Sequence, residues 1–579
     1  MASPERCTGA CPKRPSCDAD LDFVRRPMVR WLDPHQLLDT VARVIASGVW
    51  SSYADSRELQ ALVPSKHCDR SAGSDLWFDY VSDLGDGWNS TYTVARLLAA
   101  DRLNLPGAGG QHHTERGALL VMGGDQVYPV PKRSEYENRL IGPYRAALPC
   151  APAGSPELFA IPGSHDWYDG LINFTNVFCR GRPIGGWTTS QARSYFAVKL
   201  PHHWWLWGVD LQFGNYLDEA QLRYFADAAD AAMEPGDRII LCMAKEVESG
   251  RKSAEVSSDR SLDHLEREVV APAGGRVALY LKSGRHYYAR YAEDGGTGQL
   301  ITAGGGGAFL HPTQDLPERS DPHADQGFAR YRRAAVYPSA RDSKRLRKRV
   351  FLLPAFNLPL AALFGAVQVL LAFMLSLHLD ERHRDLDIGD LRLALWASPT
   401  AFLLIVLIIV TFGGLVRLAH DASGATRLVV GFVHSVMVFA TAAVVMIVAS
   451  DLSSGYGPGA GSLLAFLGLV MLMGGVGGAL GISAYFWATN CLGFHGNEAY
   501  APLHHPGYKN FLRLHIDTTG GLTVFPIGID RVARKWRWSP DGPDHAPWLA
   551  PDGAEPAIRL IEPPVRVDEG RGSPPPADL

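Results

Sequence analysis

Four long apolar runs interrupt an otherwise mixed-polarity chain of 579 residues, and they constrain its fold most strongly. Each run is long enough to cross a hydrocarbon core of about 30 Å as a helix. They contain so few charged residues that buried helices of a soluble protein explain them poorly. The sequence therefore predicts a four-helix transmembrane region within residues 350–495. The runs are Phe351–Leu379, Leu393–Val416, Leu428–Ser450 and Leu463–Thr489.

Basic residues near these runs predict their orientation, because cytoplasmic loops are enriched in Lys and Arg. The nine residues 341–349, just before the first run, include six basic ones. Arg417 and Arg427 flank the loop between the second and third runs, whereas the loop 451–461 has neither Lys nor Arg. The loop 380–392 mixes arginines with carboxylates and is a weak signal for the opposite orientation. We predict a multi-pass protein of the cell (inner) membrane whose soluble domain and both termini face the cytoplasm.

The rest of the chain divides by composition. We expect an N-terminal segment at 1–70, a soluble domain at 71–340, a C-terminal β segment at 496–562 and a disordered tail at 563–579. The net charge of −4 argues against a nucleic-acid partner. The N-terminus carries no secretory signal, so the cysteines are expected to be free cytosolic thiols. A zinc site at Cys7, Cys11 and Cys17 is the less favoured alternative to a loose N-terminal segment.

Short apolar runs alternate with helix-like stretches in the soluble domain, which predicts a layered α/β fold. Ligands of such sheets bind beyond the carboxyl ends of the strands. Polar clusters follow the expected strands at that end, so we treat the clusters as one site. The expected strands are Leu76–Val81, Ala118–Met122, Leu158–Ile161, Ile239–Cys242 and Val277–Leu281, and two of the helices are Tyr92–Ala100 and Glu219–Met233.

Several residues of these clusters suit a metal centre. Asp125 follows two glycines after a buried strand, and a carboxylate there can bridge two ions. Tyr128 lies three residues on and can ligate as a phenolate, while His286 can supply an imidazole nitrogen. His165 is followed by Asp166, which could orient the imidazole. Each residue alone is more often a turn or core residue, but the ordered set is specific.

The ordered set resembles calcineurin-like metallophosphoesterases, particularly the purple-acid-phosphatase-like arrangement and a membrane-attached bacterial branch. The resemblance covers residues 76–310 and rests on five motifs. Their counterparts are Asp83-Leu84-Gly85 for Gly-Asp-x-Gly, Gly124-Asp125 with Tyr128 for Gly-Asp-x-x-Tyr, Gly163-Ser164-His165-Asp166 for Gly-Asn-His-Asp/Glu, Lys245-Glu246 after a strand for His, and Gly284-Arg285-His286 for Gly-His-x-His.

The resemblance implies a layered β-sandwich flanked by helices and a centre that binds Fe, Mn or Zn. One metal would be held by a complete set, Asp83, Asp125, Tyr128 and His286. The second metal's set is eroded: Ser164 replaces Asn, Lys245 or Glu246 replaces a His, and Gly284 replaces another. One metal site is therefore expected, and the second site is doubtful.

Three hypotheses remain open for the eroded half. Lys245 or Arg285 replaces the second ion's charge, because phosphoryl transfer needs charge neutralisation. Alternatively, Glu246 ligates a weakened second metal. In the third hypothesis the site is a pseudoenzyme that holds a phosphorylated ligand without turnover. Under the active hypotheses His165, oriented by Asp166, stabilises the transition state or protonates the leaving group.

The favoured function is a membrane-anchored, metal-dependent phosphoesterase for a phosphomonoester or phosphodiester. The rival is a catalytically inactive membrane receptor or scaffold with the same fold. Expected partners are a phosphorylated small molecule or lipid head group and the membrane. After the last run, residues 511–517 and 522–529 alternate apolar and polar residues around a glycine turn, which predicts a small C-terminal β-hairpin.

Overall fold

The chain forms two compact units in the computed structural model. Unit 1 contains Met1–Val29, Thr40–Ala340 and His505–Leu579, and unit 2 contains Arg30–Asp39 and Arg341–His504. Thr40–Ala340 and His505–Leu579, which lie on either side of the predicted membrane region in the sequence, therefore belong to one unit. The structure describes residues 11–40, 60, 66–107, 110–151, 154–211, 217–244, 256–320, 330–378, 386–417, 424–455 and 459–567, without the side chains of 256–260 and 412–417.

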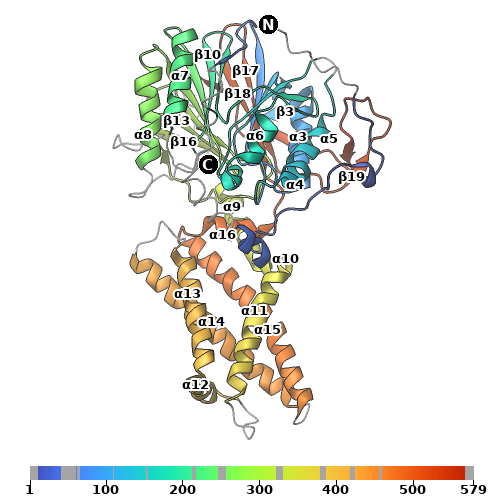
Figure 1. Ribbon diagram of the computed structural model, residues 1–579, viewed down its shortest axis with the longest axis vertical. Helices are drawn as coiled ribbons and strands as arrows, with labels where there is room; N and C mark the ends of the chain where they lie inside the picture. The colour runs from blue at the N-terminus through green and yellow to red at the C-terminus, as the bar shows by residue number, and fades with distance from the viewer. Residues whose placement is uncertain are drawn as a thin grey trace. The chain divides into compact units, whose positions relative to one another are not determined.

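Unit 1 is built on two nine-stranded sheets (Figure 1). The first sheet has the order β1 (Cys68–Asp69), β9 (Phe196–Leu200), β10 (Trp204–Val209), β11 (Arg238–Met243), β12 (Arg276–Lys282), β14 (Gln299–Ala303), β13 (Tyr288–Glu293), β16 (Tyr331–Tyr337) and β15 (Arg319–Ser320). The second has the order β21 (Ile558–Leu560), β18 (Leu522–Ile529), β17 (Lys509–Ile516), β2 (Leu76–Val81), β5 (Leu119–Met122), β6 (Glu157–Ala160), β8 (Trp187–Thr189) and β7 (Pro183–Ile184), with β22 (Val565–Val567) paired to β18.

The two sheets pack face to face and helices cover their outer faces (Figure 1). Phe78 and Phe159 of the second sheet share the inner core with Leu206 and Leu279 of the first. The outer face of the second sheet packs against α3 (Trp88–Ala99), α5 (Gly142–Ala147) and α6 (Ile172–Phe178). The outer face of the first sheet packs against α7 (Glu219–Ala232) and α8 (Val256–Leu265). The predicted mixed α/β class is confirmed.

The apolar runs located the central strands well. β2 begins and ends where its run does, β5 differs from its run by one residue at one end, and β6, β11 and β12 differ from theirs by one residue at each end. The strands β2, β5 and β6 are parallel, as are β10, β11, β12 and β14. Near-continuous apolar runs are typical of parallel strands buried on both faces. Their carboxyl ends therefore bring the polar clusters to one edge of each sheet.

The C-terminal strands lie in the middle of the second sheet. β17 pairs antiparallel with β18, and on its other side it pairs antiparallel with β2, so that Leu512 lies opposite Tyr80. Leu512, Leu514 and Ile516 alternate along β17 and are fully buried in the inner core. The hairpin region thus belongs to unit 1. Its strand β17 lies next to β2, the strand that ends just before Asp83.

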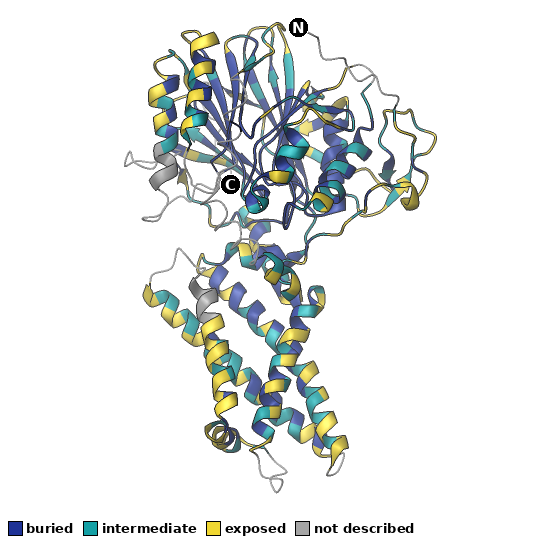
Figure 2. Cartoon of the chain, viewed as in Figure 1, coloured by how far each residue is buried: buried dark blue, intermediate teal, exposed yellow. Residues whose placement is uncertain are grey.

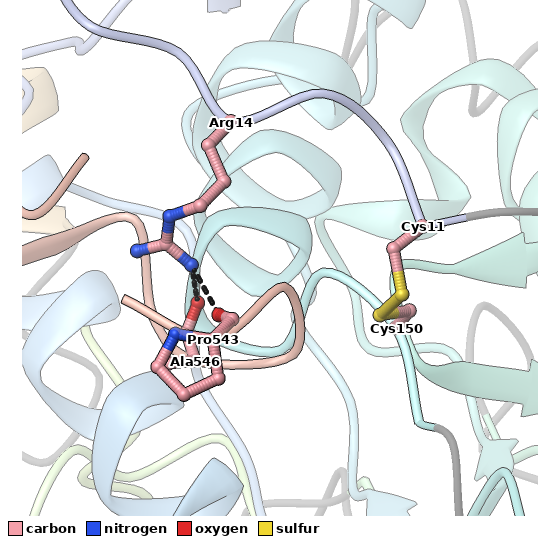
Figure 3. The surroundings of a disulfide bond; sticks show 5 residues. All are labelled: Cys11, Arg14, Cys150, Pro543 and Ala546. Carbon is pink, nitrogen blue, oxygen red and sulfur yellow. Dashed lines mark hydrogen bonds between the residues drawn. A yellow bond between two sulfur atoms is a disulfide. The ribbon is translucent and has the colours of Figure 1, made fainter. Parts of the chain in front are cut away.

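A disulfide ties the N-terminal segment to unit 1 (Figure 3). Cys11 and Cys150 are bonded with a Cα–Cα distance of 5.5 Å. Close by, the Arg14 guanidinium donates hydrogen bonds to backbone oxygens of the loop 539–547, including Pro543 and Ala546. The expectation of free thiols in a loose segment is wrong for this pair. The two cysteines are 139 residues apart, and sequence spacing does not reveal such a contact.

Unit 2 has three helices that are long and apolar enough to cross a membrane: α11 (Leu358–Ser376), α14 (Gly424–Ser454) and α15 (Ala460–Cys491). Much of the surface of these helices is exposed (Figure 2). The exposed residues include the large apolar side chains Leu428, Phe432 and Leu464. Lipid would remove such side chains from water. These properties indicate association with a membrane.

The predicted second span is broken. α12 (Ile388–Ala397) and α13 (Pro399–Arg417) meet at an angle of 101°, so the described residues give three straight spans, or four if the bent pair is one span. The break falls at Ser398, whose φ of −113° and ψ of 94° are extended. Pro399 explains the break because proline disfavours helical conformation in the preceding residue and lacks a backbone N–H.

Candidate metal centre

The first two polar clusters form one interlocked turn at the carboxyl ends of β2 and β5. The Asp83 N–H donates to Gly124 O at 3.0 Å, and the Leu84 N–H donates to Asp125 O at 2.9 Å. Asp83 and Asp125 both have a positive φ, 57° and 49° respectively. Such values are uncommon outside glycine, although Asp tolerates them better than most residues. The backbone thus holds the two aspartates in fixed, unusual conformations beside each other.

In the predicted complete half, donor atoms of the other three residues lie around the Tyr128 hydroxyl. The Tyr128 Oη lies 2.9 Å from His286 Nε2 and 3.3 Å from both Asp83 Oδ1 and Asp125 Oδ2. His286 Nε2 is 3.5 Å from Asp83 Oδ1. The structure therefore brings together the four residues that the sequence grouped from three separate clusters.

Burial dominates the electrostatics of this cluster. It raises the pKa of Asp83 to about 6, despite a hydrogen bond from Ser82, and it also raises the pKa of Asp125. Burial likewise raises the Tyr128 pKa well above its usual value and lowers the His286 pKa well below its usual value. Each shift disfavours the charged form, because a charge in a buried site loses its hydration. A cation in the cluster would reverse this preference by pairing with deprotonated ligands.

The donor set fits a single metal ion. Ligands held at about 2.0–2.2 Å from one ion lie about 3.0–3.5 Å from each other. The Tyr128 Oη lies at a comparable 2.9–3.3 Å from each of the other three donor atoms. Two carboxylates, a phenol and an imidazole are suitable donors for Fe, Mn or Zn. Within the described residues, no three His, Cys, Asp or Glu side chains form a metal-binding group on their own. The fit therefore depends on Tyr128 as a ligand.

The other half of the site has a different character. Gly284, where the resemblance expects a histidine, donates its backbone N–H to Asp83 Oδ1 at 3.1 Å. The Ser164 carbonyl accepts a hydrogen bond from the Trp167 N–H at 3.2 Å. Lys245 and Glu246 lie outside the described residues. In this half a backbone N–H, rather than a second metal ligand, lies against the Asp83 carboxylate.

The expected pairing of His165 with Asp166 is not the one that the hydrogen bonds show. His165 Nδ1 is 2.9 Å from Pro129 O, and its backbone N–H donates to Asp125 Oδ1 at 2.8 Å. Asp166 is fully buried and accepts hydrogen bonds from the Gln126 and Gly163 N–H groups and from the Tyr136 hydroxyl. Through these hydrogen bonds the Asp166 carboxylate holds the loops around Asp125 in place. Asp166 is thus a positioning residue for the loops and not the group that orients His165.

Two residues of the site surroundings were missed by the sequence analysis. Lys509, at the start of β17, is 1% exposed, and its Nζ donates to Ala308 O at 2.5 Å. Burial lowers its pKa to about 7, and its charge in turn lowers the pKa of His286. His311 stacks on His286 with ring centroids 4.1 Å apart, and its Nδ1 accepts the His286 N–H at 3.0 Å. No local pattern marks either residue, because sheet order and chain packing bring them to the site.

Arg285 is half-buried between Gly284 and His286. Its carbonyl oxygen accepts a hydrogen bond from the Tyr287 N–H at 2.8 Å, and its charge contributes to the lowered pKa of His286. This position beside a metal-ligand candidate fits the charge-replacement hypothesis. A partly solvated arginine without a role in the site would occupy the same position.

Gly304 provides a sharp test of the geometry. A Cβ at this position would lie 2.5 Å from Asp83 Oδ2 and 2.2 Å from Arg285 O. We expect Gly304→Ala to displace Asp83 and weaken metal binding at least about tenfold, which corresponds to about 1.4 kcal/mol. Calorimetric titration with Zn²⁺ or Mn²⁺ measures this directly. Gly73→Ala is the control, because its Cβ would meet no atom closer than 3.6 Å; equal affinities of the two variants would contradict the assignment.

Comparison with known proteins gives distant structural similarities only. No protein-family model matches the chain, and no curated protein matches it. Among solved structures, the chain is 15% identical, with a TM-score of 0.30, to one described as GAP50, the anchor in the inner membrane complex of Plasmodium, covering 41% of this chain and 74% of that one. It is 12% identical, with a TM-score of 0.27, to the structure of PhoD, covering 44% of this chain and 60% of that one.

A third structure is purple acid phosphatase PPD1 from yellow lupin (Lupinus luteus) seeds, with 11% identity, a TM-score of 0.25, and coverage of 44% of this chain and 47% of that one. The chain thus spans less than two thirds of the PhoD and PPD1 structures. At such TM-scores the similarity carries no weight for function, which must be argued from the residues of the site.

Proposed function

We propose that this chain is a membrane-anchored phosphoesterase that uses one metal ion held by Asp83, Asp125, Tyr128 and His286. The observation that carries the proposal is the convergence of three donor atoms, of Asp83, Asp125 and His286, within 2.9–3.3 Å of the Tyr128 hydroxyl oxygen, in a buried cluster at the carboxyl ends of the strands. A bound divalent or trivalent ion (Fe, Mn or Zn) would supply a nucleophile from water and neutralise charge on the phosphoryl oxygens.

His165 is the proposed proton donor to the leaving group. Its Nδ1 lies 2.9 Å from Pro129 O, and a carbonyl accepts only from a protonated nitrogen. Nε2 is therefore the ring atom that exchanges a proton with substrate. The hydrogen bond from the His165 N–H to Asp125 Oδ1 keeps the ring beside the proposed metal ligands. A proton donor positioned in this way contributes typically about 10²–10⁴-fold to a rate.

Positive side chains are proposed to compensate for the eroded half. Arg285 lies next to His286 in the chain, and Lys245 follows the carboxyl end of β11. Either charge could neutralise a phosphoryl oxygen that a second ion would otherwise bind. Under this proposal the substrate is a phosphorylated small molecule or a lipid head group.

The pairing of strands supports an even number of membrane crossings. β2 precedes the membrane segment 341–504 in the chain and β17 follows it, yet the two strands pair directly in one sheet. This pairing supports the proposal that both ends of the membrane segment lie on the same side of the membrane. Because α11, α14 and α15 provide three candidate spans, we propose that the bent pair of α12 and α13 is the fourth.

We propose that unit 1 faces the cytoplasm, as the basic residues at 341–349 favour. The Cys11–Cys150 bond argues for the opposite side, because structural disulfides persist mainly in oxidising compartments. Cys17 is exposed and free, so it can report the side. In a Cys491→Ser background, a membrane-impermeant maleimide is expected to label Cys17 only after the cells are permeabilised. Labelling of intact cells would place unit 1 outside.

Hydrolysis by the purified full chain in detergent tests the proposed activity. With Fe, Mn or Zn added, we expect turnover of an aryl phosphate or an aryl phosphodiester, and we expect Asp125→Ala to abolish it. Asp552→Ala, which changes an exposed aspartate in a loop of unit 1, is the matched control and should retain full activity. Bound metal without turnover that depends on Asp125 would instead support the inactive receptor or scaffold.

A further inference from the structure

The helix α9 (Ala340–Arg347) and the short helical turn that continues it, Lys348–Leu352, form a fixed platform at the start of unit 2. Ser343, Leu346 and Val350 are buried, and their spacing of three and four residues places them on one helical face. The Tyr500 hydroxyl, also in unit 2, donates to Ser343 O at 2.6 Å. This face is thus held against the rest of unit 2, and the other faces of the segment are presented outward.

The segment carries a dense positive charge: the side chains of Arg341, Lys344, Arg345 and Lys348 are exposed, and those of Arg347 and Arg349 are half-buried. Residues 341–349 contain six basic residues and one acid, Asp342, which lies 3.9 Å from Arg345. That distance and the exposure of both side chains make the pair weak. Within the described part of the chain, no ion pair is found for the other five. We name this set the basic collar: Arg341, Lys344, Arg345, Arg347, Lys348 and Arg349.

Aromatic and apolar side chains lie directly beside the basic collar. The Arg347 guanidinium is 6.0 Å from the centroid of a Trp487 ring on α15, and Phe351 lies 6.2 Å from Trp487 between ring centroids. Trp487 and Phe351 are 36% and 40% exposed, and Leu352 is 47% exposed. Exposed tryptophan near the end of a membrane-spanning helix is typical of the membrane–water interface. The basic collar therefore lies at the depth where lipid head groups are found.

We propose that the basic collar is a binding site for the phosphate head groups of anionic phospholipids. The charge of the collar complements those head groups, and the neighbouring Phe351 and Leu352 can contact the start of the acyl chains. Arginine is well suited to phosphate because its planar guanidinium donates paired hydrogen bonds. Clusters of four to eight basic residues next to a membrane span are expected to select anionic lipid in this way. The site does not depend on the proposed phosphoesterase activity.

Lipid retention measured by native mass spectrometry tests this site on the full chain. The protein is purified in a zwitterionic detergent and titrated with phosphatidylglycerol or phosphatidylcholine. We expect the wild-type chain to retain phosphatidylglycerol about tenfold more strongly than phosphatidylcholine. The variant Lys344→Gln/Arg345→Gln/Arg347→Gln/Lys348→Gln should lose this preference. The control with the same change of charge replaces four exposed arginines of unit 1, Arg102, Arg223, Arg267 and Arg332, by Gln, and it should keep the preference.

Two further arms keep the test decisive. The charge-conserving variant Lys344→Arg/Lys348→Arg should retain the preference, which separates loss of charge from loss of fold. Inorganic phosphate at millimolar concentration should not displace the lipid. The inference is overturned if the four-Gln variant keeps the wild-type preference, if the wild type does not discriminate between the lipids, or if free phosphate displaces phosphatidylglycerol and so identifies a soluble phosphate as the ligand.

Discussion

A chain that ends at residue 340 is expected not to fold into unit 1, although it contains all four proposed metal ligands. Such a chain lacks β17 and β18, which lie beside β2 within the second sheet. It would lose at least eight large buried side chains from those strands: Phe511, Leu512, Leu514, Ile516, Leu522, Val524, Ile527 and Ile529. At about 1.5–3 kcal/mol each, their burial contributes more than about 12 kcal/mol. That exceeds or equals the whole stability of most domains, about 5–15 kcal/mol.

Size-exclusion chromatography and circular dichroism of the truncated chain test this expectation. The control is a chain in which a flexible Gly/Ser linker of about 20 residues replaces 341–504, so that residues 505–579 are restored without the membrane region. It should be soluble, compact and able to bind metal. A truncated chain that is itself compact and binds metal would contradict the central place of β17 in the sheet.

Arg513→Leu is expected to lower the stability of unit 1 by about 3–5 kcal/mol, because removal of one partner of a buried ion pair leaves an uncompensated charge. Arg513 on β17 lies 3.2 Å from Asp79 on β2, and both side chains are almost fully buried. The guanidinium also donates to the carbonyls of Leu98 and Ala100 at the end of α3. The Arg513 side chain thus links β17, its neighbour β2 and the end of α3.

The loss of stability in Arg513→Leu is expected to depend on pH. Burial raises the pKa of Asp79 to about 6 even beside Arg513, so the carboxyl is readily protonated in the folded state. A folded-state pKa above the unfolded value means that folding is favoured at acid pH and that this contribution is lost as the pH rises through about 6. In Arg513→Leu the carboxyl loses its paired cation, and of the cations only the weaker influence of Arg116 remains to favour its charged form. We therefore expect a larger loss at pH 8 than at pH 5.

Thermal unfolding followed by tryptophan fluorescence measures both effects. Arg102→Leu is the matched control, since Arg102 also lies 3.2 Å from its partner, Glu115, but both side chains are more than half exposed. An exposed pair of this kind contributes at most about 1 kcal/mol. Adding Asp79→Asn to Arg513→Leu should recover part of the loss by removing the buried charge. Equal losses for Arg513→Leu and Arg102→Leu would show that the buried pair is not structural.

The sequence predicted those parts of the fold that depend on local pattern. The apolar runs located β2, β5, β6, β11 and β12, because a strand buried on both faces is apolar almost throughout. The position of β17 between β18 and β2 and the bond between Cys11 and Cys150 depend on contacts between distant residues. A single sequence does not encode such contacts in any local pattern. The break at Ser398 was readable from Pro399, although the hydropathy of the run concealed it.

The site residues that follow strands were predictable from the sequence, and the contacts that depend on the folded chain were not. Asp83, Asp125, Tyr128 and His286 each follow a strand, and the edges of the two sheets bring them together. The role of Asp166 was wrong because adjacency in sequence was taken for adjacency of side chains, whereas the turn directs its carboxylate to the Gln126 and Gly163 N–H groups. Lys509 enters from a strand that follows the membrane region, more than 220 residues after His286 in the sequence.

The number of metal ions bound per chain tests the account most directly. After loading with Fe, Mn or Zn and removal of free metal, elemental analysis of the full chain is expected to find one ion per chain in the wild type. Asp125→Ala and Tyr128→Phe should bind none at the same free metal concentration, while Asp552→Ala should bind as the wild type does. Two ions per wild-type chain, or one ion that persists in Tyr128→Phe, would contradict a single site built around the Tyr128 hydroxyl.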